Sequence, residues 1–197
     1  MPKSELKLDR RKERTQRALM RAFVELVLTK GYANVSVEEI AARADVGRST
    51  FYMHYSGREA LLKHSLSHPC EGLVALVGRE ASTEALLPRL AHFHSQRTVN
   101  RVFFVDPIRR IWMKRLAEMI EPRLATIAKQ TRAQPLLPLP LAAEAIAEAQ
   151  IGLVANWLAQ RGATKPQAVA EALIAATQAL IAALLQPAES QPRRERN

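Results

Sequence analysis

The sequence has few of the features that would indicate an enzyme, a secreted protein or a membrane protein. Its single cysteine, Cys70, excludes an intrachain disulfide and is compatible with a reducing compartment. It contains no His-Glu-x-x-His, no Gly-x-Ser-x-Gly and no phosphate-binding glycine loop, so we expect no enzymatic activity. The highly charged N-terminus lacks the apolar segment of a secretory signal. We therefore expect a cytoplasmic protein without a cofactor.

Long apolar runs are also scarce. The most apolar stretch, residues 168–185, contains Glu171 and Gln178 and follows a helical period of about 3.6 residues. Such a pattern indicates a helix that is buried or faces a partner, rather than one that spans a membrane.

Acidic residues are outnumbered by basic ones. The chain of 197 residues has 29 Lys and Arg against 19 Asp and Glu, for a formal net charge of +10. This charge suits a polyanionic partner such as nucleic acid, although charge alone is weak evidence. With 48% hydrophobic residues, the chain is long enough to bury a core in one or two domains.

Two helix-start signals bracket the most informative segment, residues 36–59. Ser36 and Glu39 have the spacing of a capping box, and Ser56 and Glu59 repeat that spacing. Between them the short turn 45–47 separates two short helical patterns. Two short helices joined by a tight turn predict a helix-turn-helix, with residues 48–54 as its recognition helix.

A basic helix is predicted just before this motif, over residues 9–30. Gly31 is expected to end it in left-handed geometry. Its first half is rich in arginine and is either a solvated face or an arm that contacts DNA phosphates. We take Arg14 as the representative phosphate contact.

Four segments resemble the TetR/AcrR family of transcriptional regulators. They are Lys30-Gly-Tyr, Val35-Ser-Val-Glu-Glu-Ile-Ala, Val46-Gly-Arg-Ser-Thr-Phe-Tyr-Met-His-Tyr and Arg58-Glu-Ala-Leu-Leu, within residues 15–63. The resemblance implies an all-α homodimer with a helix-turn-helix head and a larger helical body that binds ligands and dimerises. It also implies a repressor that a small-molecule effector releases from a palindromic DNA operator.

With this resemblance, we expect about nine helices and four segments. These are a disordered N-terminus (1–8), the helix-turn-helix domain (9–56), a linking helix with the ligand-binding and dimerisation domain (57–186), and a disordered tail (187–197).

The predicted DNA contacts concentrate on the recognition helix. Arg48 and Ser49 are placed to reach base edges, and Arg48 could pair with a guanine through two hydrogen bonds. Phe51 and Tyr55 lie on the opposite face and are assigned to the core. Glu38 departs from the family pattern, and we assign it to the helix terminus. The predicted DNA-binding residues are Ser36, Arg48, Ser49, Thr50, Tyr52, His54, Arg58 and Arg14.

Pro69 should kink or break the linking helix near residues 67–68, because proline cannot continue the hydrogen-bond ladder. His64, His68 and Cys70 have a metal-ligand composition, but this proline spoils their helical register. We expect no metal site, although the sequence alone does not decide it.

The body contains a cluster of large apolar and basic residues that could enclose an anionic effector, although each is more often core or surface. The predicted pocket residues are Phe93, Phe103, Phe104, Arg109, Trp112, Met113 and Trp157.

Two alanine-rich helices are predicted at the C-terminal end, over residues 141–160 and 166–185, with Thr164 as the cap of the second. Both are apolar on more than one face, so one side must pack on a partner. A four-helix dimer interface is expected, the alternative being a single larger core without dimerisation. The predicted interface residues are Ala145, Ala149, Gly152, Ala155, Ala159, Ala176, Leu180 and Leu184.

The function expected is therefore that of a ligand-responsive DNA-binding regulator. The alternative is a similar DNA-binding protein whose body binds another protein, and the absence of a polar-lined cavity would favour it. The operator, the regulated genes, the effector and the choice between repression and activation do not follow from the sequence.

Overall fold

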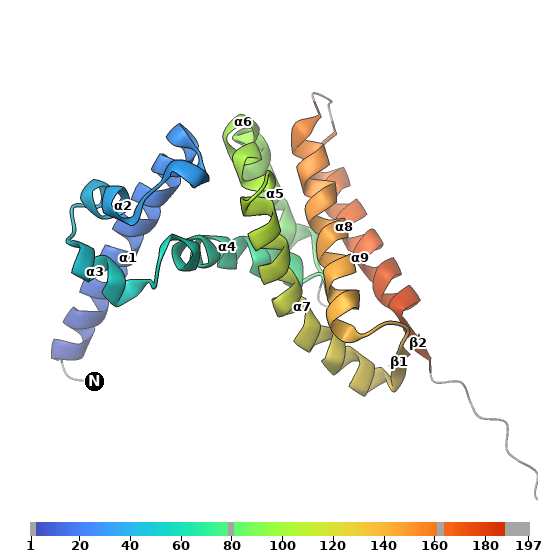
Figure 1. The fold of residues 1–197 in the computed structure, drawn as a ribbon. Coiled ribbons are helices and arrows are strands. Elements are labelled where there is room, and N and C mark those ends of the chain that lie inside the picture. The colour runs from blue at the N-terminus through green and yellow to red at the C-terminus, as the bar shows by residue number, and fades with distance from the viewer. Residues whose placement is uncertain (1–2, 79–80, 161–163, 188–197) are drawn as a thin grey trace, which may run out of the picture. The chain divides into compact units, whose positions relative to one another are not determined.

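The computed structural model describes residues 3–78, 81–160 and 164–187, which form an almost entirely helical chain (Figure 1). In order, its elements are α1 (Lys3–Lys30), η1 (Tyr32–Asn34), α2 (Val37–Arg43), α3 (Arg48–His54), α4 (Arg58–Val74), α5 (Thr83–Ser95), α6 (Arg97–Asn100), η2 (Arg101–Phe104), α7 (Ile108–Thr131), β1 (Ala133–Pro135), α8 (Leu139–Ala159), α9 (Pro166–Leu184) and β2 (Leu185–Pro187), where η marks 3-10 helices.

The chain divides into two compact units. The N-terminal unit comprises Met1–His68 and Thr98–Trp112, and the C-terminal unit comprises Pro69–Arg97 and Met113–Asn197. The predicted domain boundary after residue 56 stays a prediction, since the division found here runs through α4.

Apolar side chains from the first four helices form the core of the N-terminal unit. The apolar stripe of α1 supplies Leu19, Phe23 and Val27, and Ile40 and Phe51 come from α2 and α3. All five are fully buried, and burying a side chain of this size stabilises a fold by about 1.5–3 kcal/mol. This packing fixes which face of α3 is left for solvent.

Helix α1 ends where the sequence predicted but begins earlier. Gly31 follows its last residue with φ 79°, and its N–H bonds to the carbonyl of Val27 at 3.0 Å. The helix begins at Lys3, six residues before the expected start at Asp9. Residues 4–8 contain neither glycine nor proline, so nothing in them stops the helix.

Helix α4 differs from the prediction at both ends. It begins at Arg58, and the Leu61 N–H bonds to the Gly57 carbonyl at 3.2 Å. Gly57 therefore takes the capping position that was predicted for Ser56. The helix also continues through Pro69 to Val74, so it does not break there, and the kink that was the other predicted outcome stays a prediction. Cys70 beyond the proline is buried, and packing there favours a continuous helix over the lost bond.

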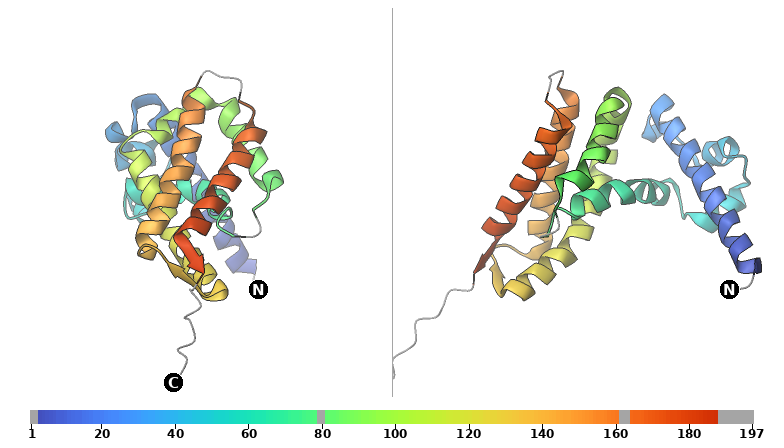
Figure 2. Two further views of the ribbon diagram at one scale, coloured as in Figure 1. Left: turned by 90° about the vertical axis from the view of Figure 1, so that its right-hand side faces the viewer. Right: turned by 180° about the vertical axis from the view of Figure 1, so that it is seen from behind.

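The C-terminal unit is built around α8 and α9, which lie side by side and run antiparallel (Figure 2). They begin and end within two residues of the predicted bounds. The short strands β1 and β2 were not predicted. They pair antiparallel with Gln134 opposite Gln186, and the Leu136 N–H extends the ladder to the Leu184 carbonyl at 2.8 Å.

The predicted cap of α9 is one residue off. Lys165 takes the N-cap position without a side-chain bond, and the carbonyl of Thr164 instead accepts from the Trp157 indole N–H at 3.0 Å. Most of the predicted disordered tail, residues 188–197, lies outside the described residues.

Candidate DNA-binding site

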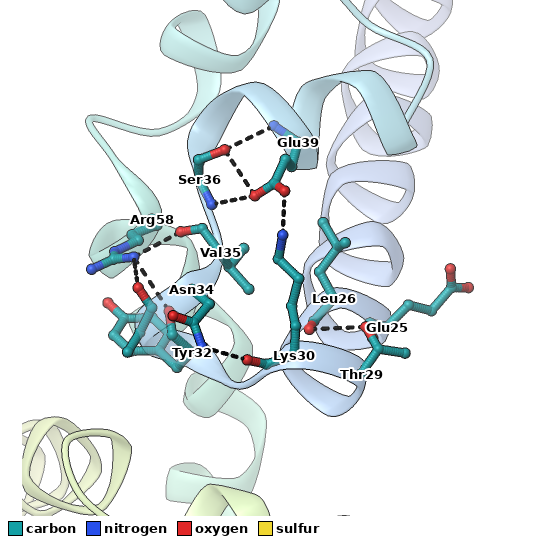
Figure 3. Close-up of polar contacts among 11 residues, drawn as sticks. Glu25, Leu26, Thr29, Lys30, Tyr32, Asn34, Val35, Ser36, Glu39 and Arg58 are labelled. Carbon is teal, nitrogen blue, oxygen red and sulfur yellow. Dashed lines mark hydrogen bonds and ion pairs between the residues drawn. The ribbon is translucent and has the colours of Figure 1, made fainter.

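The start of α2 is fixed by a polar cluster around Glu39 (Figure 3). The Ser36 hydroxyl accepts from the Glu39 N–H at 3.2 Å, and the Glu39 carboxylate accepts from the Ser36 N–H at 2.9 Å. This confirms the predicted capping box. Lys30 at the end of α1 also donates to Glu39, and these contacts, the lysine bond first, lower the pKa of the carboxyl to about 2. The Ser36 hydroxyl therefore serves the helix start.

Arg58 fixes the segment between α1 and α2 (Figure 3). Its guanidinium donates to the carbonyls of Val35 at 2.7 Å, Ala33 at 3.1 Å and Tyr32 at 3.3 Å. It also lies 4.9 Å from the centroid of the Tyr32 ring, in cation–π geometry. Burial raises the pKa of that tyrosine, against the lowering effect of Arg58. This geometry favours a structural role for Arg58 over the predicted DNA contact.

A tight turn joins α2 to α3. The Val46 N–H bonds back to the Ala41 carbonyl at 3.0 Å, and Asp45 takes a left-handed φ of 55°. Gly47 is the N-cap of α3, with an extended backbone at φ −73°. A Cβ here would meet nothing closer than the Ser49 Oγ at 3.7 Å. Neither backbone conformation nor internal packing therefore requires glycine at this position.

Helix α3 has a buried face and an exposed face. Phe51 and Tyr55 are buried, as predicted. Tyr52 is 50% exposed and Met53 75% exposed, so Tyr52 is not a core residue. Met53 is the most exposed large apolar side chain on this helix. The sequence-based prediction did not include it among the DNA-binding residues, although it directly follows Tyr52.

His54 lies between these two faces. Its ring is half-buried, and its Nδ1 has no hydrogen-bond partner among the described residues. Burial lowers its pKa, and the positive charge of Lys12 lowers it further. His54 is therefore held neutral over a wider pH range than a solvated histidine.

Arg48 and Glu38 form an ion pair across the turn, with Nη2 and Oε1 2.8 Å apart. Sequence reasoning had assigned Glu38 to the helix terminus alone. Arg43, in the last turn of α2, is paired with Glu25 of α1 at 2.8 Å. Ser49 follows Arg48 and is exposed. Arg48 is thus the exposed cation at the start of the recognition helix.

The basic face of α1 lines a groove of about 800 Å³ against the α2–α3 turn. Four arginines line it together with Asp45: Arg11, Arg14, Arg17 and Arg21. Arg17 is paired with Glu13 at 3.9 Å, whereas Arg14 forms no ion pair with any described residue.

A second groove, of about 530 Å³, connects α1 with α3. Arg11 and Lys12 line one side, and Thr50, Met53 and His54 line the other. The structure thus brings cations of α1 next to polar and apolar side chains of α3. Cations, hydroxyls and an aromatic ring around exposed grooves can bind a phosphate backbone and reach base edges.

In α4, His64 contacts a tyrosine, whereas the sequence had raised this histidine as a possible metal ligand. His64 Nδ1 lies 2.6 Å from the hydroxyl of Tyr55. Among the described residues, no group of three or more His, Cys, Asp or Glu is placed to hold a metal ion.

The predicted pocket residues are divided between the two units. In the N-terminal unit the rings of Phe104 and Trp112 pack at 4.6 Å, and Phe103 and Arg109 are half-buried. In the C-terminal unit, Phe93 and Met113 are half-buried, and Trp157 stacks on His94 at 5.0 Å. This stacking and the bond to Thr164 favour a packing role for Trp157, and the predicted pocket stays a prediction.

A cleft of about 720 Å³ does lie in the C-terminal unit, between the end of α4, α7 and α9. None of the predicted pocket residues lines it. Its polar lining residues are Arg123, Thr126, Gln130, Thr131 and Gln178.

Two glutamines bind the C-terminal end of α4 beside this cleft. Gln178 of α9 donates to the carbonyls of Leu76 and Gly78, both at 2.8 Å. Gln150 of α8 is buried and donates to the Leu73 carbonyl at 3.2 Å and to Thr177 at 3.0 Å. Amides from α8 and α9 therefore satisfy carbonyls where α4 ends.

The predicted dimer residues are mostly accessible in the single chain. Ala145, Ala149, Ala159 and Ala176 are exposed, and Gly152, Ala155 and Leu180 are half-buried. Leu184 is buried within its own chain, which does not favour a place at an interface.

By length and composition alone, α9 is apolar enough to cross a membrane. One such helix is weak evidence, because a core helix of a soluble protein can have the same length and composition.

Comparison with known proteins identifies the family. Residues 19–64 match the model of bacterial regulatory proteins of the tetR family. A Bacillus subtilis (strain 168) protein, the uncharacterized HTH-type transcriptional regulator YxbF, is 34% identical over 71 residues, which are 36% of this chain and 19% of that protein. Residues 19–64 therefore belong to the TetR family. The family consists of transcriptional regulators, which confirms the expectation of a non-enzymatic protein.

Solved structures of TetR-family proteins share the fold. NalD of Pseudomonas aeruginosa, the secondary repressor of the MexAB-OprM multidrug efflux pump, gives a TM-score of 0.55 at 22% identity, over 88% of this chain and 98% of that one. Thermus thermophilus FadR, a TetR-family repressor in complex with lauroyl-CoA, gives 0.53 at 21% identity, over 90% and 99%. At these identities the likeness shows the fold, and it confirms the predicted helical head and body.

Proposed function

We propose that this TetR-family chain is a cytoplasmic, homodimeric repressor that binds a palindromic DNA operator and is released by a small-molecule effector. The observation that carries the proposal is the exposed face of α3, beside a groove lined by the cations of α1. A recognition helix enters the major groove through such an exposed face, while nearby cations bind phosphates.

Each side chain on or beside the exposed face of α3 has a role suited to its chemistry. Arg48 pairs with a guanine, and Thr50 and Met53 contact a thymine methyl or a neighbouring phosphate. Tyr52 and His54 bind phosphate oxygens. The predicted contact of Ser49 with base edges is kept, since its side chain is exposed.

Contacts outside α3 come chiefly from α1. Arg14 binds a phosphate, since it is exposed in the arginine groove and makes no ion pair with a described residue. Ser36 and Arg58 are given structural roles, because their polar atoms are already bonded within the N-terminal unit.

The exposed alanine-rich faces of α8 and α9 support dimerisation. Small side chains permit close helix approach, and two such helices from each chain make a four-helix interface. A two-fold dimer presents two recognition helices, which matches a palindromic operator.

The polar-lined cleft beside Gln178 supports a small-molecule effector over a body that only binds another protein. Its volume of about 720 Å³ lies in the range of ligand sites. The relative in complex with lauroyl-CoA supports a ligand-responsive body in this architecture.

The test is to sequence genomic fragments that the purified protein retains. We expect enrichment of one palindromic sequence, and compounds that release this DNA then identify the effector. If no sequence is enriched over input DNA, the proposed function is wrong.

A further inference from the structure

The ion pair between Glu38 and Arg48 joins the two helices of the helix-turn-helix at their exposed edge. Glu38 lies in the first turn of α2 and Arg48 is the first residue of α3, with 2.8 Å between Oε1 and Nη2. The two side chains are 52% and 63% exposed, so the pair lies at the surface that faces the operator in the proposed complex.

The fold itself does not require this pair. The start of α2 is already capped by Ser36 and Glu39, and Glu39 is bound to Lys30. An exposed ion pair contributes little to stability, because solvent screens it and two long side chains must be ordered to form it. A carboxylate on a DNA-facing surface is also unfavourable for phosphate binding. Glu38 therefore calls for an explanation other than folding.

The geometry of the guanidinium supplies one. Arginine has five N–H donors, and the contact to Glu38 is made through Nη2, which leaves donors free for a base. An arginine that is already held loses less side-chain freedom when it pairs with a guanine. The same carboxylate weakens complexes in which Arg48 contacts a phosphate instead of a base. In such complexes the negative charge of Glu38 lies next to the negative phosphate.

We propose that Glu38 is a positioning residue that sets operator specificity by holding Arg48 for a guanine and by opposing non-specific phosphate contacts. This inference rests on the proposed function, because it assumes that α3 reads DNA.

The experiment measures binding by fluorescence anisotropy over a series of salt concentrations. The probes are the enriched genomic duplex and a duplex of scrambled sequence. The proteins are the wild type, Glu38→Gln, Arg48→Ala, the double variant and the control Glu84→Gln. Glu84 is an exposed residue of α5 in the C-terminal unit, so this control makes the same charge change elsewhere.

Glu38→Gln is expected to lower the ratio of operator affinity to scrambled-duplex affinity by about twofold to tenfold, the range for ordering one long side chain. Part of this decrease in the ratio should come from tighter binding of the scrambled duplex. The double variant should show the ratio of Arg48→Ala alone, because Glu38 acts through Arg48. Glu84→Gln should keep the wild-type ratio.

Three results overturn the inference alone: an unchanged ratio for Glu38→Gln, an effect that adds to that of Arg48→Ala, or an equal effect of Glu84→Gln. If the wild-type protein binds the operator and the scrambled duplex equally well, the proposed function is wrong, and the inference falls with it.

Discussion

At the scale of single residues, Glu39 connects two helices of the N-terminal unit. Its carboxylate accepts from Ser36 at the start of α2 and from Lys30 at the end of α1. These bonds favour the charged form, so they stabilise the fold only while Glu39 is ionised. Folding stability is thereby linked to the pKa of one carboxyl group.

The sign of the pH dependence follows from the lowered pKa. Above the ordinary value of 4.5 the stabilisation is complete, and it is lost as the pH falls toward the folded-state value of about 2. Glu39→Gln should be less stable than wild type at pH 6, and the difference should shrink between pH 4.5 and pH 2. Urea denaturation across this range measures it. Glu144→Gln, at an exposed site of α8, is the control, and a difference that stays constant with pH would contradict the account.

Substitutions of Arg58, at the start of α4, test whether its charge stabilises the fold or binds DNA. Arg58→Ala removes a charged donor from the carbonyls of Tyr32, Ala33 and Val35, and should lower the free energy of unfolding by about 1.5–3 kcal/mol. Arg58→Lys keeps the charge but cannot reproduce the planar fork, so it should be destabilised too.

Equilibrium denaturation and the salt dependence of operator binding are both measured for these variants. Unchanged stability, together with a salt slope reduced by up to about 0.9 in Arg58→Ala, would restore the phosphate contact that the sequence suggested.

At the scale of elements, the end of α4 is fixed by side chains from α8 and α9. Gln178→Ala removes two bonds to the Leu76 and Gly78 carbonyls, which should cost about 1–3 kcal/mol in the free energy of unfolding. The amides of residues 75–77, which close this turn, should then exchange faster.

Hydrogen exchange detected by mass spectrometry measures this effect. The matched control is Gln167→Ala, since Gln167 lies on the same helix and its side chain bonds to Glu171 instead. Equal protection of residues 75–77 in both variants would show that the glutamine does not hold this turn.

Local signals predicted most elements because the interactions that define them are close in sequence. The Ser36 capping box, the left-handed Gly31 and the apolar stripe of α1 each depend on neighbours within a few residues. The strands β1 and β2 are separated by fifty residues and are three residues long, so no local pattern marks them. Packing around Cys70 overrode the signal of Pro69.

The candidate site was predictable in outline but not in its partners. Buried and exposed faces of α3 follow from helical spacing, which separated Phe51 and Tyr55 from the exposed residues. The ion pair of Arg48 with Glu38 and the three hydrogen bonds that Arg58 donates to backbone carbonyls depend on how the helices pack. Residue type and the family resemblance therefore assigned both arginines to DNA, whereas in the structure Arg58 donates to the carbonyls of Tyr32, Ala33 and Val35.

At the scale of the whole molecule, the proposed dimer depends on the exposed faces of α8 and α9. A Cβ at Gly152 would meet no atom within 4 Å, so a larger residue fits the single chain. Gly152→Glu should therefore fold, yet split the dimer and weaken operator binding, because a charge would be buried between chains.

Analytical ultracentrifugation of Gly152→Glu beside Ala91→Glu checks this. Ala91 is an exposed alanine of α5, and the same charge there should leave the dimer intact. If Gly152→Glu sediments as a dimer, the interface lies elsewhere on the molecule.

The central claim is that α3 reads an operator while α1 binds the flanking phosphates. The most direct measurement is the salt dependence of binding to operator and scrambled duplexes for the wild type, Arg48→Ala and Arg14→Ala. We predict that Arg48→Ala loses preference for the operator, whereas Arg14→Ala weakens binding to both duplexes and reduces the salt slope by up to about 0.9. If both variants keep wild-type affinity and salt dependence on the operator, the account is wrong.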